Sequence, residues 1–158
     1  MKIIIIYASK HQTTQECSLI LQRELDGEAD LVPLSNVSEF QIKQYDALVV
    51  GAPVYYGKPA KEVRNFLEKK QKLLLSKKIY LFLSSKEETS EYFEAYPQKI
   101  IEHARAKIFV GSKLEFKNLS LIERLIMRAI KAKTYSDIKT ERIRDLAEVI
   151  KSDLGYNK

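Results

Sequence analysis

The chain has 158 residues, a length that suits one compact domain over residues 1–158 and leaves little room for two. Apolar residues make up 45% and charged residues 30%; the net charge of +6 favours anionic partners such as phosphate-bearing cofactors, acidic proteins, nucleic acid or anionic lipid, unless it serves solubility alone. The single cysteine, Cys17, excludes an internal disulfide, argues against a cysteine-built metal site and fits a reducing, cytoplasmic setting.

The first half of the chain predicts three strands that alternate with helices. Four isoleucines and a tyrosine make Lys2–Tyr7 a strand buried on both faces. An amphipathic helix follows, and Gly27 is its end signal. Further strands are expected at Ala29–Leu34 and Asp46–Gly51. The segment Ala52–Pro59 is expected to be a loop, with its final proline in the first turn of the next helix.

The second half continues the alternation of strands and helices, which implies βαβ units and a parallel sheet. The last helix has a threonine as its expected N-cap and a glycine just beyond its end. The expected strands are Lys78–Ser84 and Ala106–Val110, the latter extended by Lys113–Phe116, and the expected helices are one that ends near Ala104, one over Leu119–Lys133 and one over Thr140–Leu154.

In a doubly wound sheet the ligand lies outside the carboxyl ends of the strands, which makes the loops after the strands informative. The first loop reads Ser9-Lys10-His11-Gln12-Thr13-Thr14. It offers three hydroxyls, an ammonium group and no carboxylate, which suits an anion cradle at a helix N-terminus. The structural alternative is a capping box over residues 13–16, in which Thr13 caps the helix and Glu16 reaches back.

A second loop, after the third strand, carries two adjacent tyrosines framed by glycines and prolines. It reads Gly51-Ala-Pro-Val-Tyr-Tyr-Gly57, and its framing residues suggest a fixed shape. Tyr55 and Tyr56 can pack on a flat, partly apolar ring, or they merely cover the edge of the sheet.

Together, these two loops resemble those of the flavodoxin family, and the resemblance extends over most of the chain. It implies a three-layer α/β fold whose five-stranded parallel sheet has the order 2-1-3-4-5, with one FMN at its carboxyl edge. The family usually has glycine at the position of Gln12, where glycine permits a positive φ. The resemblance implies phosphate contacts from Ser9, Lys10, His11, Gln12, Thr13 and Thr14, ring contacts from Pro53, Val54, Tyr55, Tyr56 and Gly57, and contacts near the far ring edge from Ser85 and Lys86.

The C-terminal third has an extra helix before the final helix, and the chain is basic. Both features resemble the flavodoxin-type, menaquinone-dependent protoporphyrinogen oxidases more than the typically acidic electron carriers. The residues that fall in matching places are Gly111, Glu123, Arg124, Leu125, Ile126, Met127 and Ile130. This resemblance implies an FMN-dependent oxidoreductase that passes electrons from an organic substrate to a quinone. The alternatives are a soluble carrier between protein partners and a flavin-less binding module. No catalytic side chain is expected, because the flavin carries the chemistry. No metal site is expected, because His11 and His103 are too few and too far apart, and no nucleic-acid partner is expected.

The extra helix, Ser120–Lys133, combines an apolar stripe with basic side chains. Such a helix can lie in a membrane interface with its cations toward anionic headgroups, which would give peripheral contact at the inner face of a membrane. Alternatively, the stripe packs on the sheet or on a neighbouring subunit.

Overall fold

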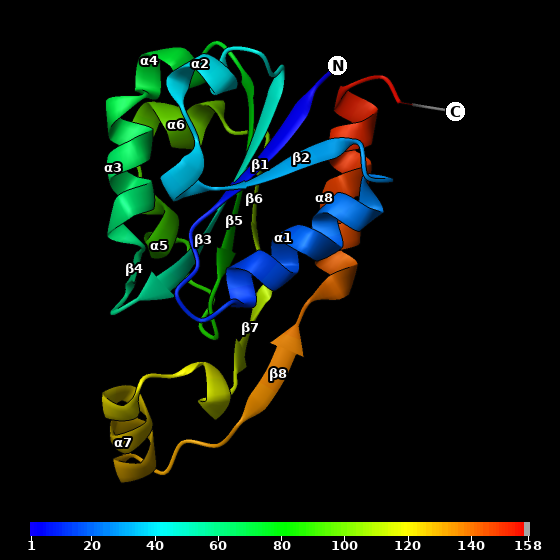
Figure 1. Ribbon diagram of the computed structural model, residues 1–158. Helices are drawn as coiled ribbons and strands as arrows, with labels where there is room; N and C mark the ends of the chain where they lie inside the picture. The colour runs from blue at the N-terminus through cyan, green and yellow to red at the C-terminus, as the bar shows by residue number, and fades with distance from the viewer. Residues whose placement is uncertain (157–158) are drawn as a thin grey trace.

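The computed structural model describes residues 1–156 as a central parallel sheet with helices on both faces (Figure 1). The sheet has the order β2-β1-β3-β5-β6, which is the predicted order once the two-residue strand β4 is counted separately. The predicted flavodoxin-like α/β fold is therefore confirmed. The strands of the sheet are β1 (Ile3–Tyr7), β2 (Ala29–Pro33), β3 (Ala47–Tyr55), β5 (Lys78–Ser84) and β6 (Ala106–Phe109).

Strand β1 shows why an unbroken apolar run forms a strand here. It pairs in parallel with β2 on one edge and with β3 on the other, and all five of its residues are buried. Ile4 and Ile6 belong to the core on one face of the sheet, and Ile3 and Ile5 belong to the core on the other. Because both faces are covered by helices, no position on the strand needs a polar side chain.

The two faces of the sheet are covered by different sets of helices (Figure 1). On one face, α1 (Thr13–Glu24) and α8 (Thr140–Asp153) pack against the sheet and each other. On the other face, the helix expected to end near Ala104 is two short helices, because Pro97 lacks an N–H and disfavours helical backbone before it. The helices on this side are α2 (Glu39–Ile42), α3 (Lys61–Lys69), α4 (Gln71–Leu74), α5 (Glu91–Glu94) and α6 (Gln98–His103), with a 3-10 turn at Leu34–Asn36.

The predicted loop Ala52–Pro59 is wrong, because the third strand continues through it. Strand β3 reaches Tyr55 and pairs antiparallel with β4 (Lys58–Pro59). The turn between them has φ of 51° at Tyr56 and 76° at Gly57, the double positive φ of a type I′ hairpin. The proline therefore lies in β4, and the N-cap of α3 is Ala60.

The predicted extension of the fifth strand is also wrong. After β6, Gly111 has φ of 84°, and the chain leaves the main sheet. Strand β7 (Gly111–Leu114) pairs antiparallel with β8 (Tyr135–Ile138), and α7 (Leu121–Ala129) lies between them in sequence. We call residues 111–138 the arm. Figure 1 shows the arm extending from the end of the sheet opposite the two chain termini.

Two of the predicted helix caps are wrong. The N-cap of α1 is Gln12, because Thr13 Oγ1 instead donates to the Lys113 carbonyl oxygen in the arm at 3.3 Å. The N-cap of α8 is Lys139, whose N–H donates to the Val110 carbonyl oxygen and whose own carbonyl accepts from the first turn; Thr140 is the first helical residue. A capping box does occur at α7, between Ser120 and Glu123.

Candidate functional site

The predicted phosphate loop, Ser9–Thr14, joins the carboxyl end of β1 to the first turn of α1. Gln12 has φ of 67° and ψ of −8°, and its carbonyl accepts from the Glu16 N–H at 2.9 Å. This is the left-handed conformation for which a glycine is usual. A side chain there costs about 1–2 kcal/mol, so the glutamine preserves the shape of the loop at an energetic cost. The departure from glycine is therefore no argument for a flavin-less protein.

Two hydroxyls of this loop are buried without a partner. Ser9 Oγ and Thr14 Oγ1 are shielded from solvent, and neither has a hydrogen-bond partner among residues 1–156. A buried polar group left unpaired costs about 1–3 kcal/mol, and most such groups in folded proteins are paired. Thr14 lies in the first turn of a 12-residue helix and Ser9 in the loop that leads into it, and the free N–H groups and dipole of this helix favour an anion. The donor set fits a phosphate.

The outer side chains of the same loop contact the arm. Lys10 Nζ forms an ion pair with Glu123 Oε1, and His11 Nε2 lies 3.7 Å from the same oxygen. His11 Nδ1 lies 3.3 Å from the Asn118 carbonyl oxygen. Hydrogen bonds from Lys10 and from the Ser120 N–H lower the pKa of Glu123 from 4.5 to about 2. The loop itself has no carboxylate, as the sequence indicated, but the fold brings one to it.

The tyrosine hairpin lies beside the phosphate loop. The Tyr55 hydroxyl accepts from the Lys10 N–H at 3.3 Å, and its ring meets the His11 ring edge-on at 6.2 Å between centroids. Burial raises the pKa of Tyr55 to about 12, so its phenol is neutral near pH 7. Tyr56, at the tip of the turn, is fully exposed. One tyrosine therefore fixes the hairpin on the loop, and the other presents a free aromatic face.

A cavity of about 620 Å³ lies where the loop, the hairpin and the arm meet. The loop contributes Lys10 and His11, the hairpin contributes Val54 to Tyr56, and the start of α3 adds charged side chains. The arm contributes Glu123, Ile126 and Met127 together with two leucines. Its volume is within the roughly 300–1,000 Å³ typical of small-molecule sites, and its lining mixes apolar and charged groups.

The remaining predicted site residues lie around this cavity rather than in its lining. Pro53 is buried in β3, and its carbonyl accepts from the Ala60 N–H, while Gly57 forms the turn of the hairpin. The buried Ser85 donates its N–H to the Gly111 carbonyl oxygen at 2.9 Å. Lys86 Nζ lies 5.1 Å from the centre of the Tyr135 ring in the arm. The structure thus brings the first two predicted loops together and directs Lys86 to Tyr135 in β8 of the arm.

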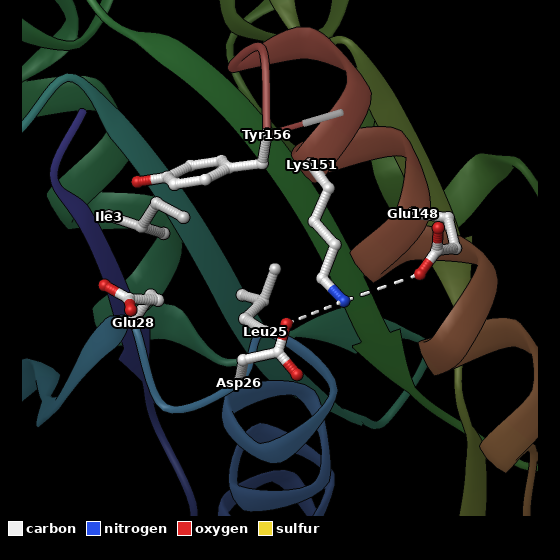
Figure 2. A pocket seen from close by; sticks show the side chains of 7 residues that line it. All are labelled: Ile3, Leu25, Asp26, Glu28, Glu148, Lys151 and Tyr156. Carbon is white, nitrogen blue, oxygen red and sulfur yellow. Dashed lines mark ion pairs between the residues drawn. The ribbon is translucent and has the colours of Figure 1, made fainter. Parts of the chain in front are cut away.

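A second hollow, of about 420 Å³, lies between the C-terminal ends of α1 and α8 (Figure 2). Lys151 bridges Asp26 at 3.2 Å and Glu148 at 3.6 Å across it, and the Tyr156 hydroxyl donates to the Met1 carbonyl oxygen. It lies at the end of the sheet remote from the phosphate loop. Lys151 pairs with two of the three carboxylates that line it, which fits a contact between the two helices and the chain ends.

The fold is that of an α/β protein with a candidate cofactor site at the carboxyl edge of its parallel sheet. A flavodoxin domain model matches residues 4–141, and the chain belongs to the flavodoxin domain family. FMN is the cofactor that this membership assigns to it. An uncharacterized protein of Methanocaldococcus jannaschii, MJ0298, is 34% identical over 83 residues; these are 52% of this chain and 53% of that relative, so the chain matches about half of its length.

Solved structures resemble this chain in fold at low sequence identity. Flavodoxin 2 from Bacillus cereus has a TM-score of 0.67 at 17% identity, over 97% of this chain and 99% of its own. Flavodoxin 1 from the same organism has 0.65 at 17%, over 96% and 98%. Rubredoxin oxygen:oxidoreductase from Desulfovibrio gigas has 0.65 at 15%, over 98% of this chain but only 36% of that protein. At these identities the likeness establishes the fold.

The sequence reasoning missed the contribution of the arm to the site. The sequence predicts Glu123, Ile126 and Met127 only as part of an extra helix, and no motif indicates that this helix lies beside the phosphate loop. One local signal was available: Ser120-Leu-Ile-Glu123 matches a capping box and fixes where α7 begins. The contact with Lys10 depends on the turn at Gly111, which the pattern of apolar residues does not reveal.

Proposed function

We propose that the chain is a single-domain FMN-dependent oxidoreductase over residues 1–158, with the phosphate held in the Ser9–Thr14 loop and the flavin ring beside the tyrosine hairpin. The orphan hydroxyls of Ser9 and Thr14 support the phosphate position, because a phosphate would give both a partner. The exposed face of Tyr56 supports the ring position, since flat aromatic surfaces pack well on one another. The hairpin residues Pro53, Val54, Tyr55 and Gly57, with Ser85 and Lys86 farther away, keep their proposed places around the ring.

When bound, FMN supplies the redox chemistry by taking up and releasing electrons. The chain's own residues hold and shield it. The neutral phenol of Tyr55 fixes the hairpin against Lys10 and His11, which keeps Tyr56 in place. Ile126 and Met127 close the cavity on the arm side and reduce the access of water.

The exposed apolar face of α7 is the observation that carries the finer proposal, a quinone as electron acceptor. Leu121, Ile122, Leu125 and Ile130 are 63–77% exposed, so this stripe does not pack on the sheet as one alternative expected. Exposed apolar patches mark interaction surfaces. The same helix lines the FMN cavity with its other side, so a lipid surface under α7 would bring a dissolved quinone close to the flavin.

We propose that this surface is an anionic lipid bilayer at the cytoplasmic side, contacted through residues 120–133. Arg128, Lys131 and Lys133 flank the apolar face, and none of them forms an ion pair in the described part of the chain. Arg124 has a structural role within the arm, because its guanidinium donates hydrogen bonds to the Phe116 and Lys117 carbonyl oxygens. Among residues 1–156, no helix is long and apolar enough to cross a membrane, so the proposed contact is peripheral.

The second candidate is a soluble electron carrier between proteins. The likeness to the Bacillus cereus flavodoxins over nearly their whole length favours it. In that case the exposed face of α7 would meet a protein partner. The proposal that the electron donor is similar to protoporphyrinogen rests only on the resemblance of the C-terminal third of the chain.

Anaerobic turnover separates these two functions. The FMN-loaded protein is mixed with protoporphyrinogen IX and vesicles that contain menaquinone. A quinone-linked oxidase removes hydrogen from the donor and forms one quinol for every two hydrogen atoms removed. Quinol formation with this donor supports the proposal, whereas reduction only of added electron-carrier proteins supports the soluble carrier.

Vesicle binding tests the surface itself. Wild-type protein should bind phosphatidylserine vesicles, with binding that weakens as salt rises. The double variant R128E/K131E should partition more than about tenfold less, since each basic residue near such a surface contributes about 1 kcal/mol. The control is K69E/K72E, the same charge reversal on exposed residues at the end of α3 and in α4. Equal partitioning of both variants would exclude the proposed membrane contact.

A further inference from the structure

We propose that Glu123 determines the selectivity of the site among flavins, because it competes with the cofactor phosphate for the phosphate loop. The inference rests on the proposed FMN site. The loop has two groups of side chains with different partners. The hydroxyls of Ser9 and Thr14 are buried and without partners among residues 1–156, whereas the side chains of Lys10 and His11 face the carboxylate of Glu123.

The position of Glu123 is fixed from both sides. Its Oε2 accepts from the Ser120 N–H at 3.0 Å, which locks the side chain to the first turn of α7. Its Oε1 pairs with Lys10 and lies 3.7 Å from His11 Nε2. The carboxylate is only 21% exposed and lines the cavity, so it contributes a fixed negative charge to the site.

A fixed carboxylate at this place acts differently on FMN and on riboflavin. The phosphate of FMN is an anion bound within the same loop, so it is repelled by Glu123 and must share Lys10 with it. Riboflavin has the same ring but no phosphate and avoids both effects. When the phosphate takes Lys10, the arm loses its ion pair to the loop. FMN binding should therefore loosen the contact of α7 with the body, whereas riboflavin binding should not.

Flavin titration of E123Q tests this competition. Glutamine keeps the hydrogen bond of the capping box but removes the charge. We expect E123Q to bind FMN about three- to tenfold more tightly than wild type, with less gain at high salt, and to bind riboflavin unchanged. The matched control is E115Q, which removes a carboxylate from the same arm but from partners Lys113 and Lys117. E115Q should shift FMN affinity much less.

Two further measurements distinguish competition for Lys10 from a purely structural role of Glu123. In a K10Q background, E123Q should have a smaller effect on FMN affinity, because the shared cation is gone. Hydrogen exchange of residues 115–131 should rise when wild type binds FMN and stay constant with riboflavin. Weaker FMN binding by E123Q, or equal shifts for both flavins, would show that Glu123 only anchors the arm. Wild type that binds neither flavin would instead overturn the FMN site itself, and this inference with it.

Discussion

The sheet and the arm use the same kinds of apolar side chain in opposite ways. In the sheet, Ile4, Leu48 and Leu81 are fully buried between one face of the sheet and the helices that cover it. In the arm, Leu121 and Leu125 lie on a well-capped helix whose apolar face is exposed. Apolar surface stabilises a fold only when it is removed from water. The stripe on α7 therefore contributes little to the stability of the free chain and is available for binding.

A pair of leucine truncations should show the largest contrast between the two regions. Leu81→Ala, in the fully buried centre of β5, should lower the free energy of unfolding by about 2–5 kcal/mol. Leu125→Ala should change it by less than about 0.5 kcal/mol, as for other exposed positions. Urea unfolding followed by circular dichroism measures both. A loss of several kcal/mol from Leu125→Ala would mean that the α7 stripe is covered in solution, for instance by a second copy of the chain.

The junction between the regions can be broken at Gly111. A Cβ there would lie 1.9 Å from the Asp137 carbonyl oxygen, and the backbone has φ of 84°. Gly111→Ala should therefore separate β8 from β7 and destabilise the arm by about 1–3 kcal/mol, the usual cost of such strain. Hydrogen exchange should rise across residues 111–138 and stay low in β1 and β5. Gly57→Ala, with a similar φ in the hairpin, is the control and should leave exchange in the arm unchanged.

These contrasts also explain which parts of the fold could be predicted. β1 and β5 were found to within one residue, because buried parallel strands leave unbroken apolar runs in the sequence. The path of the arm was not predicted, because the chain changes direction at the positive φ of Gly111. The spacing of apolar residues in the sequence carries no sign of this turn. The hairpin was missed because Tyr56 has a positive φ that its residue type disfavours.

Within the candidate site, the sequence indicates the chemistry of the phosphate loop but not the contacts between residues that are far apart in the chain. The hydroxyl-rich loop between a buried strand and a helix indicated an anion site, and the structure leaves two of its hydroxyls without a partner among the described residues. The carboxylate that faces Lys10 comes from Glu123, which is 113 positions later in the sequence. Such a contact follows from the path of the arm, and the path depends on the turn at Gly111.

The two threonines of the phosphate loop should differ in what their hydroxyls contribute to FMN binding and to the arm contact. Thr14→Val removes an orphan hydroxyl, so the free protein should be as stable as wild type or more stable. FMN binding should weaken by about 1.5–3 kcal/mol, the value of a hydrogen bond to a charged group, and riboflavin binding should not change. Thr13→Val instead removes the bond to the Lys113 carbonyl and should weaken the arm contact more than FMN binding. Fluorescence titration with both flavins, together with urea unfolding, separates the two cases.

The smallest effects are expected at two residues that both have a left-handed backbone conformation. Gln12 starts α1 in the body, with φ of 67°, and Lys131 follows α7 in the arm, with φ of 56°. The Ala132 N–H donates to the Met127 carbonyl oxygen, so Lys131 holds the position after a helix where glycine is common. Glycine removes about 1–2 kcal/mol of strain at either site but loses about 0.4–1 kcal/mol through the greater freedom of the unfolded chain.

The net gain is therefore at most about 1.6 kcal/mol for each substitution, with a midpoint of about 0.8 kcal/mol, but it should appear in different measurements. Gln12→Gly should raise the global free energy of unfolding, because the loop joins β1 to α1 in the core. Lys131→Gly should slow hydrogen exchange in α7 and leave the global value unchanged if the arm opens independently of the sheet. An equal rise in global stability from both variants would show that the arm and the sheet unfold as one cooperative unit. In that case α7 would be held as firmly as the sheet, and its exposed stripe would be presented by a rigid part of the fold.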